Sequence, residues 1–390
     1  MRIAVIANSS WYLVNFRLSL MKALTAAGHE VVAVGPPDNY VGKLAAAGIR
    51  HRAVPLAAAS VNPIRELGTV LALYRVIRDE GIEMVFSYTP KGNIYSAIAA
   101  AMNGSLTVPN VSGLGLVFIR RSPLTWLVKQ LYRLTFWRAV RVFFQNHDDL
   151  ALFVRLGLVR AEKAQRLPGS GVDLVRFAPA ERGTASASAE RALQAGAAEA
   201  SSRRNFAFLL VARLLWDKGV GEYIEAARKV RLKYPAVKFR LLGFLDVQNP
   251  SAIPKAKVEA WVAEGVVAYL GSTDDVLPYL SEADCVVLPS FYREGVPRTL
   301  LEAAAMARPL ITTDAPGCRD AVDDGVTGLL CRPQDADDLA DKMLRMIEMD
   351  RDELLAMGRR GREKMVREFD ERIVISHYLQ VVDEAAGRRA

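Results

Sequence analysis

Residues 283–314, "ADCVVLPSFYREGVPRTLLEAAAMARPLITTD", decide the fold class of this 390-residue chain. The stretch begins with the apolar run "ADCVVLPS", passes through a loop broken by Gly295 and Pro297, and continues into the alanine-rich segment "RTLLEAAAMA". It ends with a second strand-like run, "RPLITTD". Short apolar runs on either side of one helix are typical of a β-α-β unit, whose strands are parallel and buried on both faces.

The same alternation continues along the chain and predicts two domains. Strands are expected at 2–7, 30–34, 83–86, 106–109, 139–144, 205–214, 237–243 and 266–271, and helices at 15–30, 62–81, 91–104 and 219–235. Residues 180–204 lack an apolar face and are interpreted as a low-complexity linker or insertion. We therefore expect an α/β protein with two Rossmann-like, doubly wound domains that face each other across a cleft. The expected segments are 1–179, 205–370 and a carboxy-terminal helix, 371–390, that returns to the first domain.

The composition is that of an ordered protein of a reducing compartment. Hydrophobic residues make up 51% of the chain and charged residues 24%, which is the balance of a globular protein. The three cysteines fit neither a disulfide framework nor a metal site, and this favours the cytoplasm. The apolar run after Met1 is too short for a secretory leader, and polar residues and one proline, Pro109, interrupt the uncharged stretch 92–119. No transmembrane segment is predicted.

Positive charge is concentrated in the first part of the chain. Residues 1–180 contain 21 Lys and Arg against 10 Asp and Glu, and no acidic residue lies between Glu83 and Asp148. We expect this surface to meet an anionic partner. The segment 118–144 mixes basic and aromatic residues and predicts an interfacial helix on an anionic membrane, starting at Ser122-Pro123. The candidate membrane residues are Arg120, Arg121, Trp126, Lys129, Arg133, Trp137 and Arg138. A buried helix with a solvated basic face is the alternative, and no nucleic-acid-binding module is evident.

Several cofactor motifs are absent from the sequence. Neither predicted domain has a G-x-G-x-x-G signature after its first strand, which disfavours a nicotinamide or flavin cofactor. The stretch "GPPDNYVGKL" has Leu44 where a P-loop needs Ser or Thr. The four histidines form no H-x-x-x-H pair, and "DAD" at 335–337 is expected to cap the helix that follows. Neither an organic cofactor nor a catalytic metal is expected.

Two glutamates in the opening stretch, Glu294 and Glu302, allow two interpretations. The sequence Thr299-Leu300-Leu301-Glu302 fits a capping box, in which Glu302 would bond back to the Thr299 backbone N–H. Glu294, however, follows a predicted strand and lies beside Gly295. Loops at the carboxyl edge of a parallel sheet are ligand positions, which favours a binding role for this glutamate.

The spacing of Glu294 and Glu302 resembles the E-x7-E motif of retaining glycosyltransferases, and "YREGVPRTLLEAAAMARPLITTDAPGCRDAV" resembles glycosyltransferase family 4. Further similar stretches are "NSSWYLVNFRLSLMKALTAAGHEV", "SYTPKGNIYS", "NVSGLG", "PGSGVDLVRFAP" and "VARLLWDKGVGEYIEAA". The resemblance covers nearly the whole chain except 180–204, and it implies the GT-B fold and a nucleotide-sugar donor. Ala307 stands where glycine is usual in the family, which we interpret as a small packing change.

The resemblance implies a role for each candidate residue. Glu302 would hold the nucleotide ribose and Glu294 would face the donor sugar. Arg213 and Lys218 would bind the diphosphate, because the negative charge that develops on a departing nucleotide can be met by fixed cations and backbone donors instead of a metal. The donor is expected to be a UDP-sugar, and the catalytic set to be Glu294, Arg213 and Lys218. Further nucleotide contacts are expected from Gly295 and, through free N–H groups at a helix start, from Thr299 and Leu300.

Family members that this chain resembles extend saccharides on undecaprenyl diphosphate, a polyprenyl diphosphate. The resemblance thus implies a peripheral hexosyltransferase on the cytoplasmic face of the inner membrane. Expected acceptor contacts are Asn15, Arg17, Tyr88, Lys91 and Ser112, with Tyr88 where family members often have a histidine. A transferase acting on a soluble acceptor, a nucleotide-sugar epimerase of similar fold and a degenerate scaffold remain alternatives.

Overall fold

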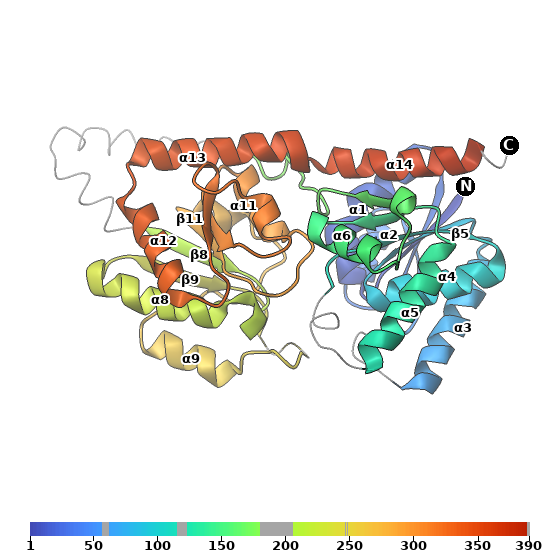
Figure 1. Cartoon of the computed structure of the whole chain (residues 1–390), viewed down its shortest axis with the longest axis horizontal. Coiled ribbons are helices and arrows are strands. Elements are labelled where there is room, and N and C mark those ends of the chain that lie inside the picture. The colour runs from blue at the N-terminus through green and yellow to red at the C-terminus, as the bar shows by residue number, and fades with distance from the viewer. Residues whose placement is uncertain (57–61, 115–122, 180–205, 246, 248, 388–390) are drawn as a thin grey trace. The chain divides into compact units, whose positions relative to one another are not determined.

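The structure is a computed structural model, and it describes residues 1–56, 62–114, 123–179, 206–245, 247 and 249–387 (Figure 1). The chain divides into two compact units, one made of Met1–Ser170 with Glu371–Ala390 and the other of Gly171–Asp370. The segment 180–204, interpreted as a linker from the sequence, lies outside the described residues.

The first unit is built on a seven-stranded sheet of order β3-β2-β1-β4-β5-β6-β7. Its strands are β1 (Arg2–Ile6), β2 (Glu30–Gly35), β3 (Arg50–Ala53), β4 (Met84–Tyr88), β5 (Leu106–Val111), β6 (Val142–Phe144) and β7 (Ala164–Arg166). All neighbouring pairs are parallel. Strand order reverses between β1 and β4, so the predicted doubly wound sheet is confirmed for this unit.

Helices cover both faces of this sheet. They are α1 (Ser10–Ala26), α2 (Val41–Ala46), α3 (Pro63–Asp79), α4 (Pro90–Asn103), α5 (Pro123–Trp137), α6 (His147–Arg155) and α14 (Glu371–Gly387), with a 3₁₀ turn at Ala161–Lys163. α1 starts five residues before the predicted helix, because Ser9 is its N-cap and accepts a hydrogen bond from the Tyr12 N–H at 3.2 Å. α5 starts at the predicted Pro123.

The helix α14 supplies core residues to the first unit. Tyr378 packs edge-on against Phe86 of β4 and Phe143 of β6, with ring centroids 4.8 Å away in each case. Its hydroxyl accepts a hydrogen bond from Asn110 Nδ2 at 2.9 Å. A helix distant in sequence therefore completes the core on the face that α1 also covers.

The second unit contains a six-stranded sheet of order β10-β9-β8-β11-β12-β13, again parallel throughout. The strands are β8 (Ala207–Val211), β9 (Lys238–Leu242), β10 (Ala268–Tyr269), β11 (Cys285–Leu288), β12 (Leu310–Thr313) and β13 (Gly328–Cys331). β10 is shorter than the predicted strand 266–271, and as an edge strand it pairs only with β9. The β-α-β unit predicted from residues 283–314 is β11, α11 and β12.

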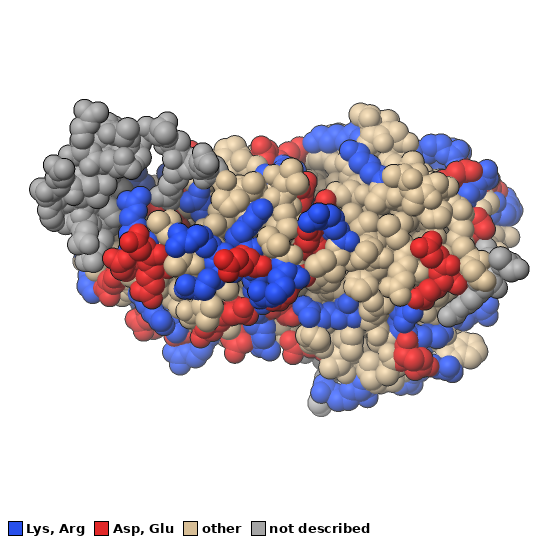
Figure 2. Space-filling model, turned by 90° about the horizontal axis from the view of Figure 1, so that it is seen from above, with Lys and Arg blue, Asp and Glu red and all other residues tan. Residues whose placement is uncertain are grey.

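The helices of the second unit are α8 (Val220–Lys233), α9 (Lys255–Ala263), α10 (Leu277–Ser281), α11 (Arg298–Ala305), α12 (Ala336–Glu348) and α13 (Arg351–Lys364). Asp335 caps α12 by accepting from the Asp338 N–H, as the sequence predicted. Ion pairs such as Arg228–Glu264 and Lys233–Glu348 join neighbouring elements. Basic and acidic side chains are interspersed over the face shown in Figure 2.

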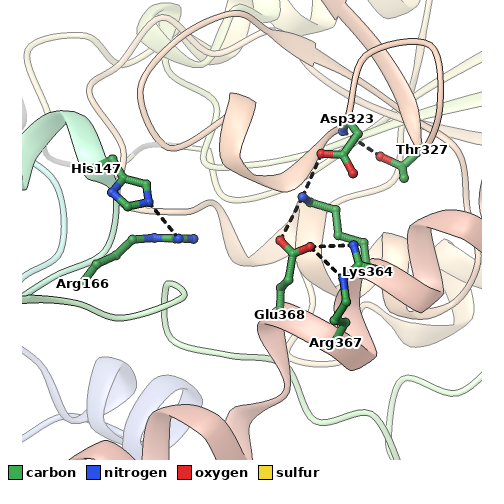
Figure 3. A network of polar contacts seen from close by, with 7 residues as sticks. All are labelled: His147, Arg166, Asp323, Thr327, Lys364, Arg367 and Glu368. Carbon is green, nitrogen blue, oxygen red and sulfur yellow. Dashed lines mark hydrogen bonds and ion pairs between the residues drawn. The ribbon is translucent and has the colours of Figure 1, made fainter.

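A single π-helical turn, Met365–Phe369, follows α13. Lys364 at its start donates to Asp323 at 2.9 Å and to Glu368 at 3.0 Å, and the Asp323 N–H donates to Thr327 Oγ1 (Figure 3). Within the first unit, Arg166 donates to His147 Nε2 at 3.0 Å, which joins the start of α6 to β7 (Figure 3). These contacts hold side chains close to the boundaries between the two units, at Ser170 and Asp370.

Ala307 follows α11 in the left-handed conformation, with φ of 56°. A left-handed residue after a helix is usually glycine, because a Cβ is strained there. The alanine therefore adopts a backbone conformation that favours glycine, and its interpretation as a small packing change stays a prediction.

Candidate active site

Lys218 and Glu294 meet at the carboxyl ends of β8 and β11. Lys218 ends the 3₁₀ turn Trp216–Lys218, and Glu294 lies in the loop that joins β11 to α11. Their side chains form an ion pair and are only 12% and 13% exposed. Ser290 Oγ donates to the same Glu294 oxygen at 3.1 Å. A largely buried cation beside a carboxylate at this edge of a parallel sheet is positioned to bind a polar ligand.

Two glycines allow the loops around this ion pair to touch. A Cβ built on Gly219 would lie 2.0 Å from the Pro289 carbonyl oxygen, and one on Gly317 would lie 1.5 Å from the Gly295 carbonyl oxygen. Both glycines have a positive φ, 74° and 82°. Sequence reasoning singled out neither residue. Their positions fix Lys218 and Glu294 through backbone contact.

Arg213 follows β8 and is exposed. Its charge acts on Tyr292, whose pKa is raised by burial and by Glu294 and lowered by Arg213. The ammonium of Lys218 lies 5.4 Å from the centre of the Tyr292 ring. The charges of Arg213 and Glu294 therefore both act on the tyrosine that lies near Lys218.

Glu302 lies on the second turn of α11 and is buried. Its Oε1 accepts from Arg298 Nε at 2.7 Å, one helical turn earlier. The capping-box interpretation is therefore wrong, since the helix begins after Pro297 and the carboxylate points to Arg298. Burial raises the pKa of Glu302, and the Arg298 guanidinium opposes that shift.

The start of α11 differs in one respect from the prediction. The Leu300 N–H donates to the Pro297 carbonyl at 3.1 Å, so it is not free, and the Leu300 side chain is buried. Thr299 is half-buried, and Gly295 is buried beside Gly317. The prediction of a free N–H at Leu300 is wrong because the first helical turn tightens onto Pro297.

The acceptor residues predicted in the first unit have different environments. Arg17 and Tyr88 are buried, with the guanidinium carbon 4.1 Å from the Tyr88 ring centre. Direct contact of these two with an acceptor stays a prediction. Lys91 pairs with Glu66 at 2.9 Å, Asn15 Nδ2 donates to the Trp11 carbonyl at 2.9 Å, and Ser112 is half-buried.

The predicted membrane residues lie on α5, directly after it (Arg138) or outside the described residues. Arg120 and Arg121 belong to the last group. Trp126 and Trp137 are 64% and 59% exposed, Arg138 is exposed and Lys129 is half-buried. Arg133 donates to the carbonyls of Leu156 and Gly157 at 3.0 and 3.1 Å. Its side chain is exposed, and its contact with lipid stays a prediction.

The described residues contain neither a metal-ligand cluster nor a membrane-spanning helix. No group of three or more His, Cys, Asp or Glu residues there is arranged to hold a metal ion. None of the helices described has both the length and the apolarity needed to cross a bilayer.

Comparison with known families identifies the chain. Residues 14–170 match the glycosyl transferase 4-like domain, and residues 205–349 match the glycosyl transferases group 1. The chain is a glycosyltransferase. The family expected from the E-x7-E spacing is thereby confirmed, and this glycosyltransferase is a hexosyltransferase by family and by its relatives.

Two relatives of this glycosyltransferase align over most of their length. One is N,N'-diacetylbacillosaminyl-diphospho-undecaprenol alpha-1,3-N-acetylgalactosaminyltransferase of Campylobacter jejuni, 28% identical over 98% of both chains. The other is UDP-Gal:alpha-D-GlcNAc-diphosphoundecaprenol alpha-1,3-galactosyltransferase of Escherichia coli, 25% identical over 86% of this chain and 83% of that protein.

Solved structures similar to this glycosyltransferase share its fold. HepE from Anabaena, determined in complex with UDP, superposes with a TM-score of 0.77 at 18% identity, covering 98% of this chain and 100% of that one. A glycosyltransferase from Rickettsia africae gives a TM-score of 0.76 at 16% identity, covering 98% of each chain. The predicted GT-B class, with two parallel-sheet Rossmann-like domains, is confirmed.

Proposed function

We propose that this glycosyltransferase moves a hexose or N-acetylhexosamine from a UDP-sugar to a saccharide linked to polyprenyl diphosphate. The names of the two relatives above support the acceptor class, since both act on diphospho-undecaprenol saccharides. The UDP complex of HepE supports the nucleotide. The observation that carries the proposal is the largely buried Lys218–Glu294 pair at the carboxyl edge of the second sheet.

The chemistry follows from the charges at this edge. When the bond between sugar and UDP breaks, negative charge develops on the diphosphate, and Lys218 and Arg213 stabilise it without a metal. Glu294 orients Lys218 and accepts hydrogen bonds from donor-sugar hydroxyls. Glu302 accepts hydrogen bonds from the ribose hydroxyls, with Arg298 fixing its orientation.

The anomeric configuration is retained in this proposal. The acceptor hydroxyl attacks from the face that UDP leaves, and a diphosphate oxygen takes its proton. Tyr88 is buried and does not serve as the base.

A transfer assay tests the function. The full chain is incubated with labelled UDP-sugars, with and without a short-chain polyprenyl-diphosphate saccharide, and products are separated by phase and chromatography. Label is expected in the lipid-linked product only when the acceptor is present. The new glycosidic bond should have the same anomeric configuration as the donor sugar. A free nucleotide-sugar isomer formed without acceptor would identify an epimerase instead. Transfer only to soluble sugars would contradict the acceptor class.

Glu302→Gln is expected to weaken UDP binding about tenfold, because hydrogen bonds to a charged group are worth about 1.5–3 kcal/mol each. Burial raises the pKa of Glu302, so this carboxylate should become protonated at a higher pH than an exposed glutamate. On acidification, the affinity of the wild type for UDP should therefore begin to fall at that higher pH. The affinity falls on acidification because only the ionised form of Glu302 accepts hydrogen bonds from both ribose hydroxyls. Calorimetry with UDP across the acidic to neutral range measures both effects. The phosphate groups of UDP also titrate, but their contribution is the same for the wild type and for Glu302→Gln. Identical pH profiles of UDP affinity for the two proteins would exclude a contact between Glu302 and the ribose.

We further propose that the first unit binds the surface of an anionic membrane. Large apolar side chains are exposed on the two helices that flank α4: Ile64, Leu67 and Leu71 on α3, and Trp126, Leu127, Leu134 and Trp137 on α5. Amphipathic helices of this kind bind the boundary between headgroups and acyl chains. Arg138 and Lys129 add attraction to anionic lipid.

Flotation with vesicles of phosphatidylglycerol and phosphatidylethanolamine measures this binding. The wild type should move with the lipid, and the double variant Trp126→Ser, Trp137→Ser should lose most of that fraction. Leu232→Ser, on α8 of the second unit, is the matched control because Leu232 is 88% exposed there. If the wild type stays with the soluble fraction, or the double variant floats equally well, the membrane proposal fails.

A further inference from the structure

The six-stranded sheet of the second unit has an open edge at β10. Among the described strands, β10 pairs only with β9, so its other side has no partner strand. Ala268, the first residue of β10, is exposed and has only a methyl side chain. The edge of a sheet offers backbone N–H and C=O groups to a strand from another chain.

A pocket of about 950 Å³ lies along this edge. Residues of β9 and β10 line it, together with the end of α8 and part of α10. The helix α10 follows β10 and has only five residues, so it covers a short part of the sheet beside it. The edge therefore combines an open strand with room for side chains that another chain supplies.

The end of the pocket at the start of β9 is basic. Arg231 and Lys238 line it, and Lys238 is exposed and forms no ion pair with a described residue. Arg240 also lines the pocket, but Glu282 pairs with it at 2.9 Å and balances its charge. Two cations are thus left without a carboxylate at this end.

The other end of the pocket, beyond β10, is acidic. Asp274 and Asp275 follow the strand and are exposed, and Arg176 pairs with Asp275 at 3.0 Å. The hydrogen bonds that Asp275 makes with described residues all go to Oδ1, so Oδ2 can accept from a further donor. Because two carboxylates face one guanidinium, this end keeps negative charge.

A second copy of the chain matches the pocket at both ends. When two identical edges pair antiparallel about a two-fold axis, the basic end of each meets the acidic end of the other. Lys238 of one copy then lies opposite Asp275 of the other, and this contact occurs twice. A parallel arrangement would instead bring like charges together. Two-fold pairing also uses both open edges, so it stops at two copies.

We propose that the chain forms a two-fold symmetric dimer through the β10 edge, in which Lys238 of each copy pairs with Asp275 of the other. The dimer goes beyond the proposed function and does not depend on it.

Sedimentation velocity of the full chain over a range of concentrations tests the proposal. The wild type should sediment as a dimer that dissociates on dilution and more readily in high salt. Lys238→Glu and Asp275→Lys each place like charges opposite one another at both symmetric contacts. Each should therefore raise the dissociation constant at least about a hundredfold.

Mixing the two charge variants gives the sharpest result. In a mixed dimer, the two reversed charges face each other at one contact, and the native Lys238 and Asp275 face each other at the second. The mixture should therefore contain dimers, although each variant alone is monomeric. If both variants are folded by circular dichroism and the mixture stays monomeric, the pairing of Lys238 with Asp275 is wrong.

Ala268→Lys is an independent variant, which decides the matter if a charge variant does not fold. A lysine on an edge strand hinders strand pairing, so this variant should be monomeric. Lys255→Glu is the matched control, because it reverses an exposed lysine of α9 in the same unit and should leave the dimer intact.

Three results would overturn the inference. The first is a wild type that is monomeric at every concentration. The second is a dimer that persists in the folded charge variants and in Ala268→Lys. The third is a dimer that is lost only in the double variant Trp126→Ser, Trp137→Ser, because the apolar face of the first unit would then hold the two copies together.

Discussion

Lys218→Met should lower the rate of sugar transfer by about two to three orders of magnitude, which is the usual effect of removing one group that stabilises developing negative charge. The ammonium is largely buried beside Glu294, where water screens it little. Because the charge on the diphosphate grows as UDP departs, the loss should appear mainly in kcat. Single-turnover transfer from a labelled UDP-sugar at saturating donor measures it.

Two comparisons decide whether Lys218 acts on the leaving group or only supports Glu294. Lys229→Met removes an exposed lysine of α8 that pairs with Asp337, and it should transfer sugar at the wild-type rate. The double variant Lys218→Met, Glu294→Gln also removes the negative charge of the carboxylate that has lost its lysine partner. If the double variant recovers most of the wild-type rate, Lys218 has a structural role and the catalytic assignment is wrong.

Gly317→Ala should both destabilise the second unit and abolish UDP binding. The new Cβ would lie 1.5 Å from the Gly295 carbonyl oxygen and 2.8 Å from that of Glu294, so the loop that carries Glu294 must move. The left-handed backbone at Gly317 adds about 1–2 kcal/mol of strain for any residue with a Cβ. Denaturant unfolding and UDP calorimetry measure the two effects.

Gly325→Ala is the matched control for this experiment. Gly325 has a similar φ of 74°, but among the described residues no atom comes within 4 Å of a Cβ built there. Gly325→Ala should therefore show the backbone strain alone and retain UDP binding. Equal losses in the two variants would mean that the contact between Gly317 and the Glu294 loop has no role in the site.

The sheet topology could be predicted because buried parallel strands have a strong local signal. Runs such as "RIAVI" and "MVFSY" are short, apolar and β-branched, and they are strands β1 and β4. Signals at element ends are weaker. Helix α1 begins at Ser10, after the Ser9 cap, and the edge strand β10 spans only Ala268–Tyr269 of the predicted run 266–271.

The site could be predicted only where residue type itself carries the chemistry. Glu294 and Glu302 were found through their spacing and Lys218 through the resemblance to the family, and their roles stay predictions. The partners that hold them are set by tertiary contacts: Ser290 and Arg298 become relevant once the fold brings them to the two glutamates. The burial of Arg17 and Tyr88 was missed for the same reason, since a sequence does not show that aromatic rings will cover a guanidinium.

The packing of Tyr378 against Phe86 and Phe143 has a consequence for how the protein is made. Ribosomes synthesise a chain from its amino terminus, and domains generally fold in that order during translation. Here the first unit must wait, with part of one face of its sheet uncovered, until residues 371–387 have left the ribosome. The unit that starts first is thus finished last, after the whole of the second unit has been synthesised.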